Sequence, residues 1–91
     1  MVQDRNPEYF LAIASEKSIS KAAERLHISQ PYLSQYVIHL EKEFGVRLLD
    51  RTKSPLALTA AGKVYANYLE DSSQLYEQLL QDFTRLNASR R

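Results

Sequence analysis

Apolar positions in this chain recur every three or four residues over four stretches, which is the pattern of amphipathic helices. The first stretch begins at Asn6 and Pro7, which suit the N-cap and first turn of a helix, and it ends near Glu16. We expect the apolar face of this helix to lie in the core. That face consists of Tyr9, Phe10, Ile13 and Ala14.

A short and a longer helix are predicted between residues 18 and 40, on either side of a tight turn. The short helix spans residues 21–26 with Ser20 as its N-cap, and residues 27–29 form the turn. Ser29 caps the longer helix, whose first turn holds Pro31, where a missing N–H removes no hydrogen bond. Two helices joined in this way are typical of a helix-turn-helix.

The longer helix has one apolar face and one face that lacks packing residues. A spacing of about 100° per residue places on its core face Leu33, Val37, Leu40 and Phe44. The residues that point away are Pro31, Gln35, Ile38, His39 and Lys42, with Ser34 at the edge and Gln30 at the N-terminal end. A purely solvated helix surface accounts for the polar members but does not explain an exposed isoleucine. Gly45 ends the helix in the left-handed region.

Two short strands are predicted after this helix, over residues 46–50 and 56–58. The turn between them, residues 51–55, contains Arg51 and Lys53. A hairpin at this place would project beside the longer helix as a wing.

From Thr59 to about Asn87 the pattern predicts a single helix about 43 Å long. A compact chain of this length has a radius of gyration of only about 12 Å, so the body cannot cover the helix. We therefore expect its apolar stripe to pair with the same helix of a second copy. The stripe consists of Tyr65, Tyr68, Leu69, Leu75, Tyr76, Leu79, Leu80, Phe83 and Leu86. Gly62 is expected to allow close packing on the body.

The composition limits the function classes. Ninety-one residues suit one domain with a small core. Residues 1–63 carry nine Lys and Arg against seven Asp and Glu, whereas residues 64–84 carry four acids and no base. The chain has no cysteine and no apolar run near the roughly 20 residues that span a bilayer. The lack of cysteine fits a reducing cytosol, and the absence of a long apolar run argues against a membrane partner.

The exposed face of the longer helix suits the major groove of double-stranded DNA. Gln30 can pair with adenine, Ser34 can donate or accept a hydrogen bond, and an apolar side chain can contact a thymine methyl. Residues predicted for this contact are Ser29, Gln30, Pro31, Tyr32, Ser34, Gln35 and Ile38. Phosphate contacts are expected from Ser18 and Ser20 at the second helix and from Arg51, Thr52 and Lys53 in the wing.

Several runs between Tyr9 and Gly62 carry a family resemblance: AAERLHISQP, LEKEFGVRLLDRT and LTAAG, with Leu-Ser at positions 33 and 34. In these runs the chain resembles the N-terminal DNA-binding region of the LysR-type transcriptional regulators, and the following helix resembles their linker helix. The resemblance implies a winged helix-turn-helix over residues 1–58 and a dimerising linker helix over residues 59–91. It also implies homodimers that bind inverted repeats containing a T and an A at a fixed spacing, with tetramers possible in the full-length protein.

The family's base-reading and backbone positions fall on Gln30, Pro31, Tyr32, Ser34, Gln35, Arg51 and Thr52. Its small-molecule effector binds a C-terminal domain of two α/β lobes, which we expect beyond the end of this chain. The family commonly has a base at position 35, yet here no Lys or Arg occurs between residues 28 and 40. Base contacts are therefore expected to use neutral hydrogen bonds and apolar contact, with positive charge mainly in the wing.

Other function classes find less support in the sequence. His27 and His39 lie on different elements, and Ser34 and His39 point to different sides of one helix, so neither a metal site nor a catalytic pair is predicted. We expect no enzyme and no cofactor. Two alternatives stay open: a helical protein-interaction module without DNA specificity of its own, and a molybdate-responsive regulator, which has a similar winged domain.

Overall fold

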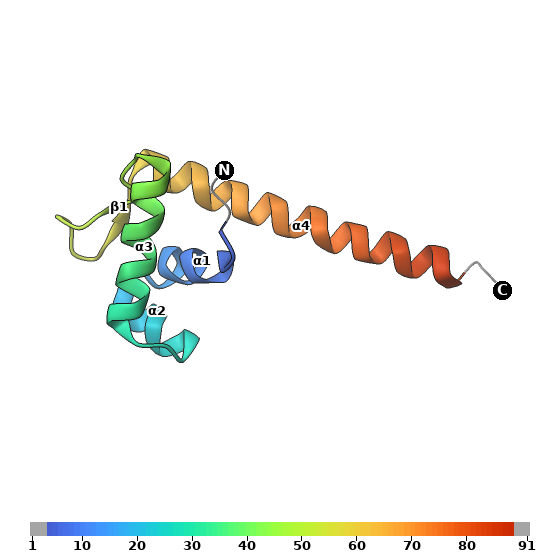
Figure 1. The fold of residues 1–91 in the computed structure, drawn as a ribbon, viewed down its shortest axis with the longest axis horizontal. Coiled ribbons are helices and arrows are strands. Elements are labelled where there is room, and N and C mark those ends of the chain that lie inside the picture. Colours follow the sequence, from blue (N-terminus) through green and yellow to red (C-terminus); the bar gives the residue numbers. More distant parts are fainter. Residues whose placement is uncertain (1–3, 89–91) are drawn as a thin grey trace.

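The computed structural model describes residues 4–88. Its elements in order are α1 (Pro7–Glu16), α2 (Ile19–Leu26), α3 (Gln30–Phe44), β1 (Leu49–Asp50), β2 (Ala57–Leu58) and α4 (Ala60–Ala88). The first three helices and the hairpin form a body from which α4 projects (Figure 1). The radius of gyration is 16.0 Å, above the roughly 12 Å of a compact chain of this length. A mainly helical winged helix-turn-helix followed by one long helix is thus confirmed.

The start of α2 differs from the prediction. Ser18, not Ser20, is the N-cap, and its Oγ accepts a hydrogen bond from the Lys21 N–H at 3.1 Å. Beginning the helix at Ile19 lets this side chain pack against the core, which explains the earlier start. Ser29 caps α3 as predicted, because its Oγ accepts from the Tyr32 N–H at 3.2 Å.

The core lies between the three helices of the body, β1 and the beginning of α4. Its largest fully buried side chains are Phe10, Ile13, Leu33, Leu48, Leu49 and Val37. Three residues assigned to inward faces are less covered than expected: Tyr9 and Ala14 are half-buried, and Phe44 is 37% exposed. Phe44 lies at the edge of the body, where its ring packs against Tyr65 with centroids 5.1 Å apart.

The hairpin is shorter than predicted. Its two strands pair antiparallel, with Leu49 opposite Leu58 and Asp50 opposite Ala57. Before β1, the Leu48 N–H donates to the Glu41 carboxylate at 2.7 Å. The Leu49 N–H also donates to this carboxylate, at 3.2 Å, so the side chain of Glu41, and not a neighbouring strand, binds the amides at this end of the hairpin.

A hydrogen-bonded cluster joins the N-terminal segment to two helices. The Asp4 carboxylate accepts from the Tyr36 hydroxyl of α3 at 2.7 Å and also from the Tyr65 hydroxyl of α4. Its other oxygen accepts from the Asn6 N–H at 2.9 Å. Burial and the nearby Asp4 charge raise the pKa of both tyrosines, so both hydroxyls stay protonated and donate. Asp4 therefore fastens α4 to α3.

The first turn of α4 packs closely on the strand side of the body, as predicted for Gly62. The Thr59 Oγ1 accepts from the Gly62 N–H at 3.0 Å and donates to the Arg47 carbonyl at 2.6 Å, so Thr59 caps the helix. A Cβ at position 62 would lie 2.1 Å from the carbonyl oxygen of Leu48. Only glycine fits here without moving the backbone.

We expect Gly62→Ala to lower the free energy of unfolding by about 3 kcal/mol, because the overpacking outweighs a gain of about 1 kcal/mol in helix propensity. Gly45→Ala is the matched control: its Cβ would meet nothing within 4 Å, but its φ is +72°. That backbone conformation should cost about 1 kcal/mol. Urea denaturation measures both values. An equal or smaller loss for Gly62→Ala would contradict the close packing.

Candidate nucleic-acid interface

Most of the outward face of α3 is exposed. The structure leaves exposed, as predicted, Ser29, Gln30, Pro31, Gln35, Ile38, His39 and Lys42, while Ser34 is half-buried at the edge. Ile38 is 47% exposed, an unusual setting for an isoleucine beside polar neighbours. His39 Nε2 lies 3.4 Å from Glu43 Oε1, one turn further along the exposed face of the helix.

The predicted base-reading residues divide between the two flanks of this face. Tyr32 lies toward α1, where its ring packs edge-on against Tyr9 with centroids 6.4 Å apart, although it stays 57% exposed. Ile38 lies on the opposite flank, where it lines a groove with Arg51 of the wing. Ser34 is one turn before Ile38, on the same flank. Tyr32 and Ile38 therefore cannot contact the same base edge.

At the start of α2, the two serines have different surroundings. Ser18 is half-buried and its Oγ accepts the capping bond from Lys21, whereas Ser20 is exposed. The Ser18 hydroxyl hydrogen is still available to a phosphate oxygen, since a hydroxyl both donates and accepts. Both serines can therefore donate a hydrogen bond to a DNA phosphate, as predicted from the sequence.

The wing presents Arg51, Thr52 and Lys53, all exposed. Thr52 donates through its N–H, at 3.0 Å, and through its hydroxyl to the Asp50 carboxylate. These bonds hold the pKa of Asp50 below its usual value. The hydroxyl hydrogen of Thr52 is engaged within the turn, so this residue shapes the wing.

Glu41, a residue not predicted from the sequence, fastens the wing to α3. Its side chain is buried, and its carboxylate accepts from the Leu48 N–H at 2.7 Å, the Leu49 N–H at 3.2 Å and Arg51 Nη1 at 3.3 Å. Burial raises the pKa of this carboxyl, but the three donors outweigh the burial and hold the pKa below its usual value. In the sequence, the only sign of this role is that Glu41 lies next to the apolar face of α3. Its position in the sequence does not reveal which groups it binds.

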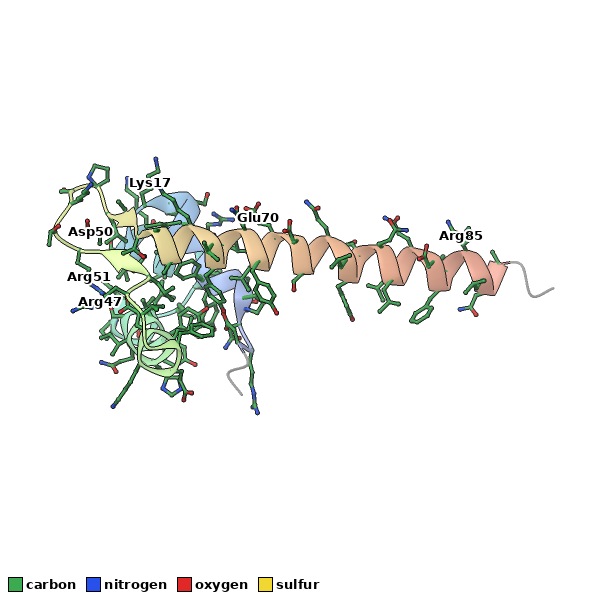
Figure 2. The ribbon with its side chains drawn as sticks, turned by 90° about the horizontal axis from the view of Figure 1, so that it is seen from above. Lys17, Arg47, Asp50, Arg51, Glu70 and Arg85 are labelled. Atoms are coloured by element: carbon green, nitrogen blue, oxygen red, sulfur yellow. The ribbon has the colours of Figure 1, made fainter. Side chains whose placement is uncertain are left out.

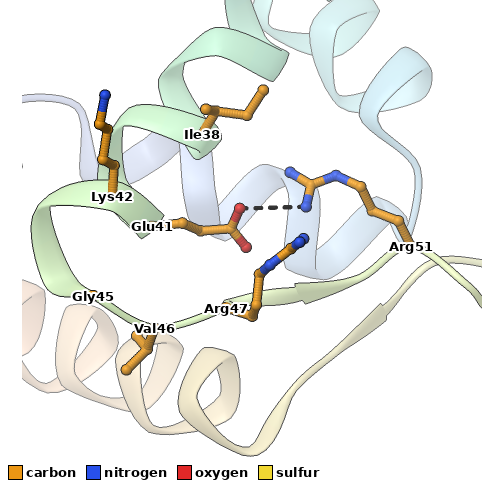
Figure 3. Close-up of a pocket in the computed structure, with 7 residues that line it drawn as sticks. All are labelled: Ile38, Glu41, Lys42, Gly45, Val46, Arg47 and Arg51. Carbon is orange, nitrogen blue, oxygen red and sulfur yellow. Dashed lines mark hydrogen bonds and ion pairs between the residues drawn. The ribbon is translucent and has the colours of Figure 1, made fainter.

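Two further cations lie beside this ion pair. Arg47 and Arg51 are close together at the base of the wing in Figure 2. Figure 3 shows both side chains extending toward Glu41, with Ile38 on the α3 side and Lys42 pointing away at the rim. Neither Arg47 nor Lys42 was among the residues predicted to bind DNA. Periodicity had placed Lys42 on the outward face of α3, whereas the position of Arg47 follows from the path of the chain between α3 and β1, which periodicity does not reveal.

The stripe of α4 is only partly bare, which corrects the predicted dimer seam. Tyr65 and Leu69 are 8% and 5% exposed because the body of the same chain covers them. The remaining predicted residues are exposed: Tyr68, Leu75, Tyr76, Leu79, Leu80, Phe83 and Leu86. The core thus includes residues beyond position 58, and Leu69 is the last buried residue of α4 within residues 4–88.

The structure gives no indication of other site chemistry within residues 4–88. In that part of the chain no three His, Cys, Asp or Glu side chains gather as a metal ion would require. Over the same residues, no helix combines the length and apolarity needed to cross a bilayer.

Comparison with known proteins shows the family of this chain. The family described as "Bacterial regulatory helix-turn-helix protein, lysR family" matches residues 5–63. The chain belongs to the LysR family. This confirms the resemblance seen in the sequence.

Named LysR relatives are similar over most of this chain. The regulator AlsR of Bacillus subtilis (strain 168) is 50% identical over 64 residues, which are 70% of this chain and 21% of AlsR. The regulator TfdT of Cupriavidus pinatubonensis is 39% identical over 87 residues, 96% of this chain and 37% of TfdT. The chain therefore spans about a fifth to two fifths of these relatives. Both are named as transcriptional regulators, in agreement with the prediction that the chain is not an enzyme.

A solved LysR structure with DNA has the same fold. The BenM DNA-binding domain in complex with catB site 1 DNA matches with a TM-score of 0.85 and 31% sequence identity. The match covers 99% of this chain and 97% of the BenM chain, so it includes the long helix as well as the body.

Proposed function

We propose that the chain binds double-stranded DNA at inverted repeats as a homodimer, with α3 in the major groove and the wing beside the adjacent minor groove. The observation that carries this proposal is the free outer face of α3, polar except for Pro31 and Ile38, next to a basic wing. The likeness to the BenM domain in its DNA complex supports the same orientation. The proposed contacts use side chains and backbone amides and need no cofactor. The proposed location is the nucleoid, in the cytoplasm.

The proposed contacts divide by chemistry. Gln30 and Ser34 supply hydrogen bonds to base edges, and Pro31 and Ile38 supply apolar surface for a thymine methyl. Ser18, Ser20 and the free amides of the first turn of α2 face phosphate oxygens, as does Lys53 of the wing. Base identity is thus read by neutral groups, while the charged groups fix the position of the domain.

A second copy of this chain is the partner proposed for α4. Its exposed stripe from Tyr68 to Leu86 is continuous with an apolar groove between α1 and α4, lined by Leu11, Val46, Val64 and Tyr76 among others. A patch of this length is rare on a monomer. Pairing two such helices about a two-fold axis covers both stripes at once and places two α3 helices on one duplex.

We expect Gln30→Ala and Ser34→Ala each to weaken binding to the preferred inverted repeat by about 1 to 3 kcal/mol and to relax one base position. Lys53→Ala should weaken binding to all sequences about equally, because a phosphate contact carries no base information. Selection of bound duplexes from a random pool, followed by affinity measurements with each variant, checks both expectations. Uniform losses for all three variants would contradict the proposed assignment of base-reading residues.

The same measurement addresses the alternative of a protein-interaction module. An intact dimer that binds no duplex at low salt would favour that alternative, with α4 as the interaction surface and the helix-turn-helix purely structural.

A further inference from the structure

The groove between α3 and the wing lies where a DNA backbone must pass. In a duplex, the major and minor grooves are separated by a phosphodiester strand. If α3 occupies one groove and the wing borders the next, as in the proposed function on which this inference rests, that strand crosses the space between them. Ile38 and Lys42 of α3 line this space on one side, and Arg47 and Arg51 line it on the other.

The charges in this groove are arranged for an anion. Glu41 is its one acid, and the carboxylate is buried and already accepts from Arg51 and two backbone amides. Arg51 gives one N–H to Glu41 and keeps further donors, because a guanidinium has five. Arg47 and Lys42 are exposed, and among residues 4–88 neither forms an ion pair with a carboxylate. Two cations beyond the Glu41–Arg51 pair therefore remain for a ligand.

The geometry points to a phosphate seat in this groove, with Arg47 as its principal side chain, Arg51 held in place by Glu41 beside it and Lys42 at the rim. Arg47 can bind a phosphate through two N–H groups at once. Ile38 forms the apolar wall against which the sugar can pack (Figure 3). The seat supplies positive charge beside residues 30–40 of α3, which contain no Lys or Arg, and adds Arg47 and Lys42 to the charge of the wing.

The test measures how affinity depends on salt. With the 91-residue chain and an inverted-repeat duplex selected from a random pool, Arg47→Gln should reduce the slope of log affinity against log salt by about 0.9 per subunit. The ratio of specific to random-duplex affinity should not change. Arg47→Lys should restore most of the slope, because it returns the positive charge.

Arg85→Gln is the control for net charge. It removes one positive charge from the far end of α4, remote from the groove in Figure 2. Its slope should equal that of the wild type, and a reduction as large as that of Arg47→Gln would overturn the phosphate seat. Arg47 is exposed and contacts Thr59 only through its backbone carbonyl, so Arg47→Gln should keep the wild-type unfolding temperature.

A second measurement locates the contact. Duplexes in which single phosphates are replaced by neutral methylphosphonate should bind the wild type about tenfold more weakly at one backbone position per half-site. In Arg47→Gln this position-specific loss should disappear. If Arg47→Gln shows the same position-specific loss as the wild type, the proposed phosphate seat is wrong, although the chain still binds DNA. If the wild type binds no duplex at low salt, the proposed function fails with it.

Discussion

Replacing Leu79 and Phe83 together with glutamate is expected to turn a dimer of this chain into monomers. The two side chains are 43% and 54% exposed in the single chain and lie on the bare part of the α4 stripe. In a two-fold dimer the change places four carboxylates in one apolar seam. Burying a charge without a partner is far more costly than the seam can offset. Sedimentation velocity or light scattering on a sizing column measures the outcome.

The opposite face of the same helix offers a matched control. Gln74→Glu with Gln81→Glu adds the same two charges per chain to exposed positions that point away from the stripe. This variant should stay dimeric. DNA affinity for the inverted repeat should fall by at least about a hundredfold only in the Leu79 and Phe83 variant, because two linked half-site contacts become independent ones. A dimer that survives the change at Leu79 and Phe83 would contradict the proposed seam.

Glu41→Ala is expected to lower the free energy of unfolding by about 3 kcal/mol. The change leaves the N–H groups of Leu48 and Leu49 without their acceptor beside a buried core, and it removes the partner of Arg51. Glu41→Gln keeps one carbonyl oxygen as an acceptor and should cost about half as much. Urea denaturation at neutral pH measures both losses.

The pH dependence tests the same carboxylate independently. Because the pKa of Glu41 is lower in the folded chain than its ordinary value of 4.5, the charged form stabilises the fold above about pH 4.5. That stabilisation is lost as the pH falls through the lowered pKa, and Glu41→Gln should not show this loss. Glu43→Gln is the control, since this exposed acid pairs only with His39 at the surface. Identical acid unfolding of the two Gln variants would contradict the role assigned to Glu41.

The sequence could predict the elements whose causes are local. Helical periodicity, Ser29 before Pro31 and glycine at position 45 placed α3 to within a residue. The projection of α4 beyond the body followed from its predicted length. The start of α2 was misplaced because Ser18 and Ser20 could each cap it, and the choice depended on the packing of Ile19 against the core.

The parts that could not be predicted depend on contacts between distant segments. Periodicity put Tyr65 and Leu69 on the same stripe as Leu79 and Phe83, but it could not show that the body covers only the first two. The bond between Asp4 and Tyr65 joins residues 61 positions apart. Arg47 likewise gained its place in the candidate site from the route of the chain into the hairpin.

In the proposed dimer, the attachment of α4 to the body affects the distance between the two DNA half-sites that the dimer contacts. Beyond Leu69 the helix extends about 28 Å further at 1.5 Å per residue. The hydrogen bonds of Asp4 with Tyr36 and Tyr65 attach the beginning of this helix to the body. If α4 tilts by about 10° at this attachment, its C-terminal end moves by about 5 Å, which is more than the 3.4 Å rise of one base pair. In the proposed dimer, the Asp4 cluster would therefore affect the distance between the two half-sites along the duplex.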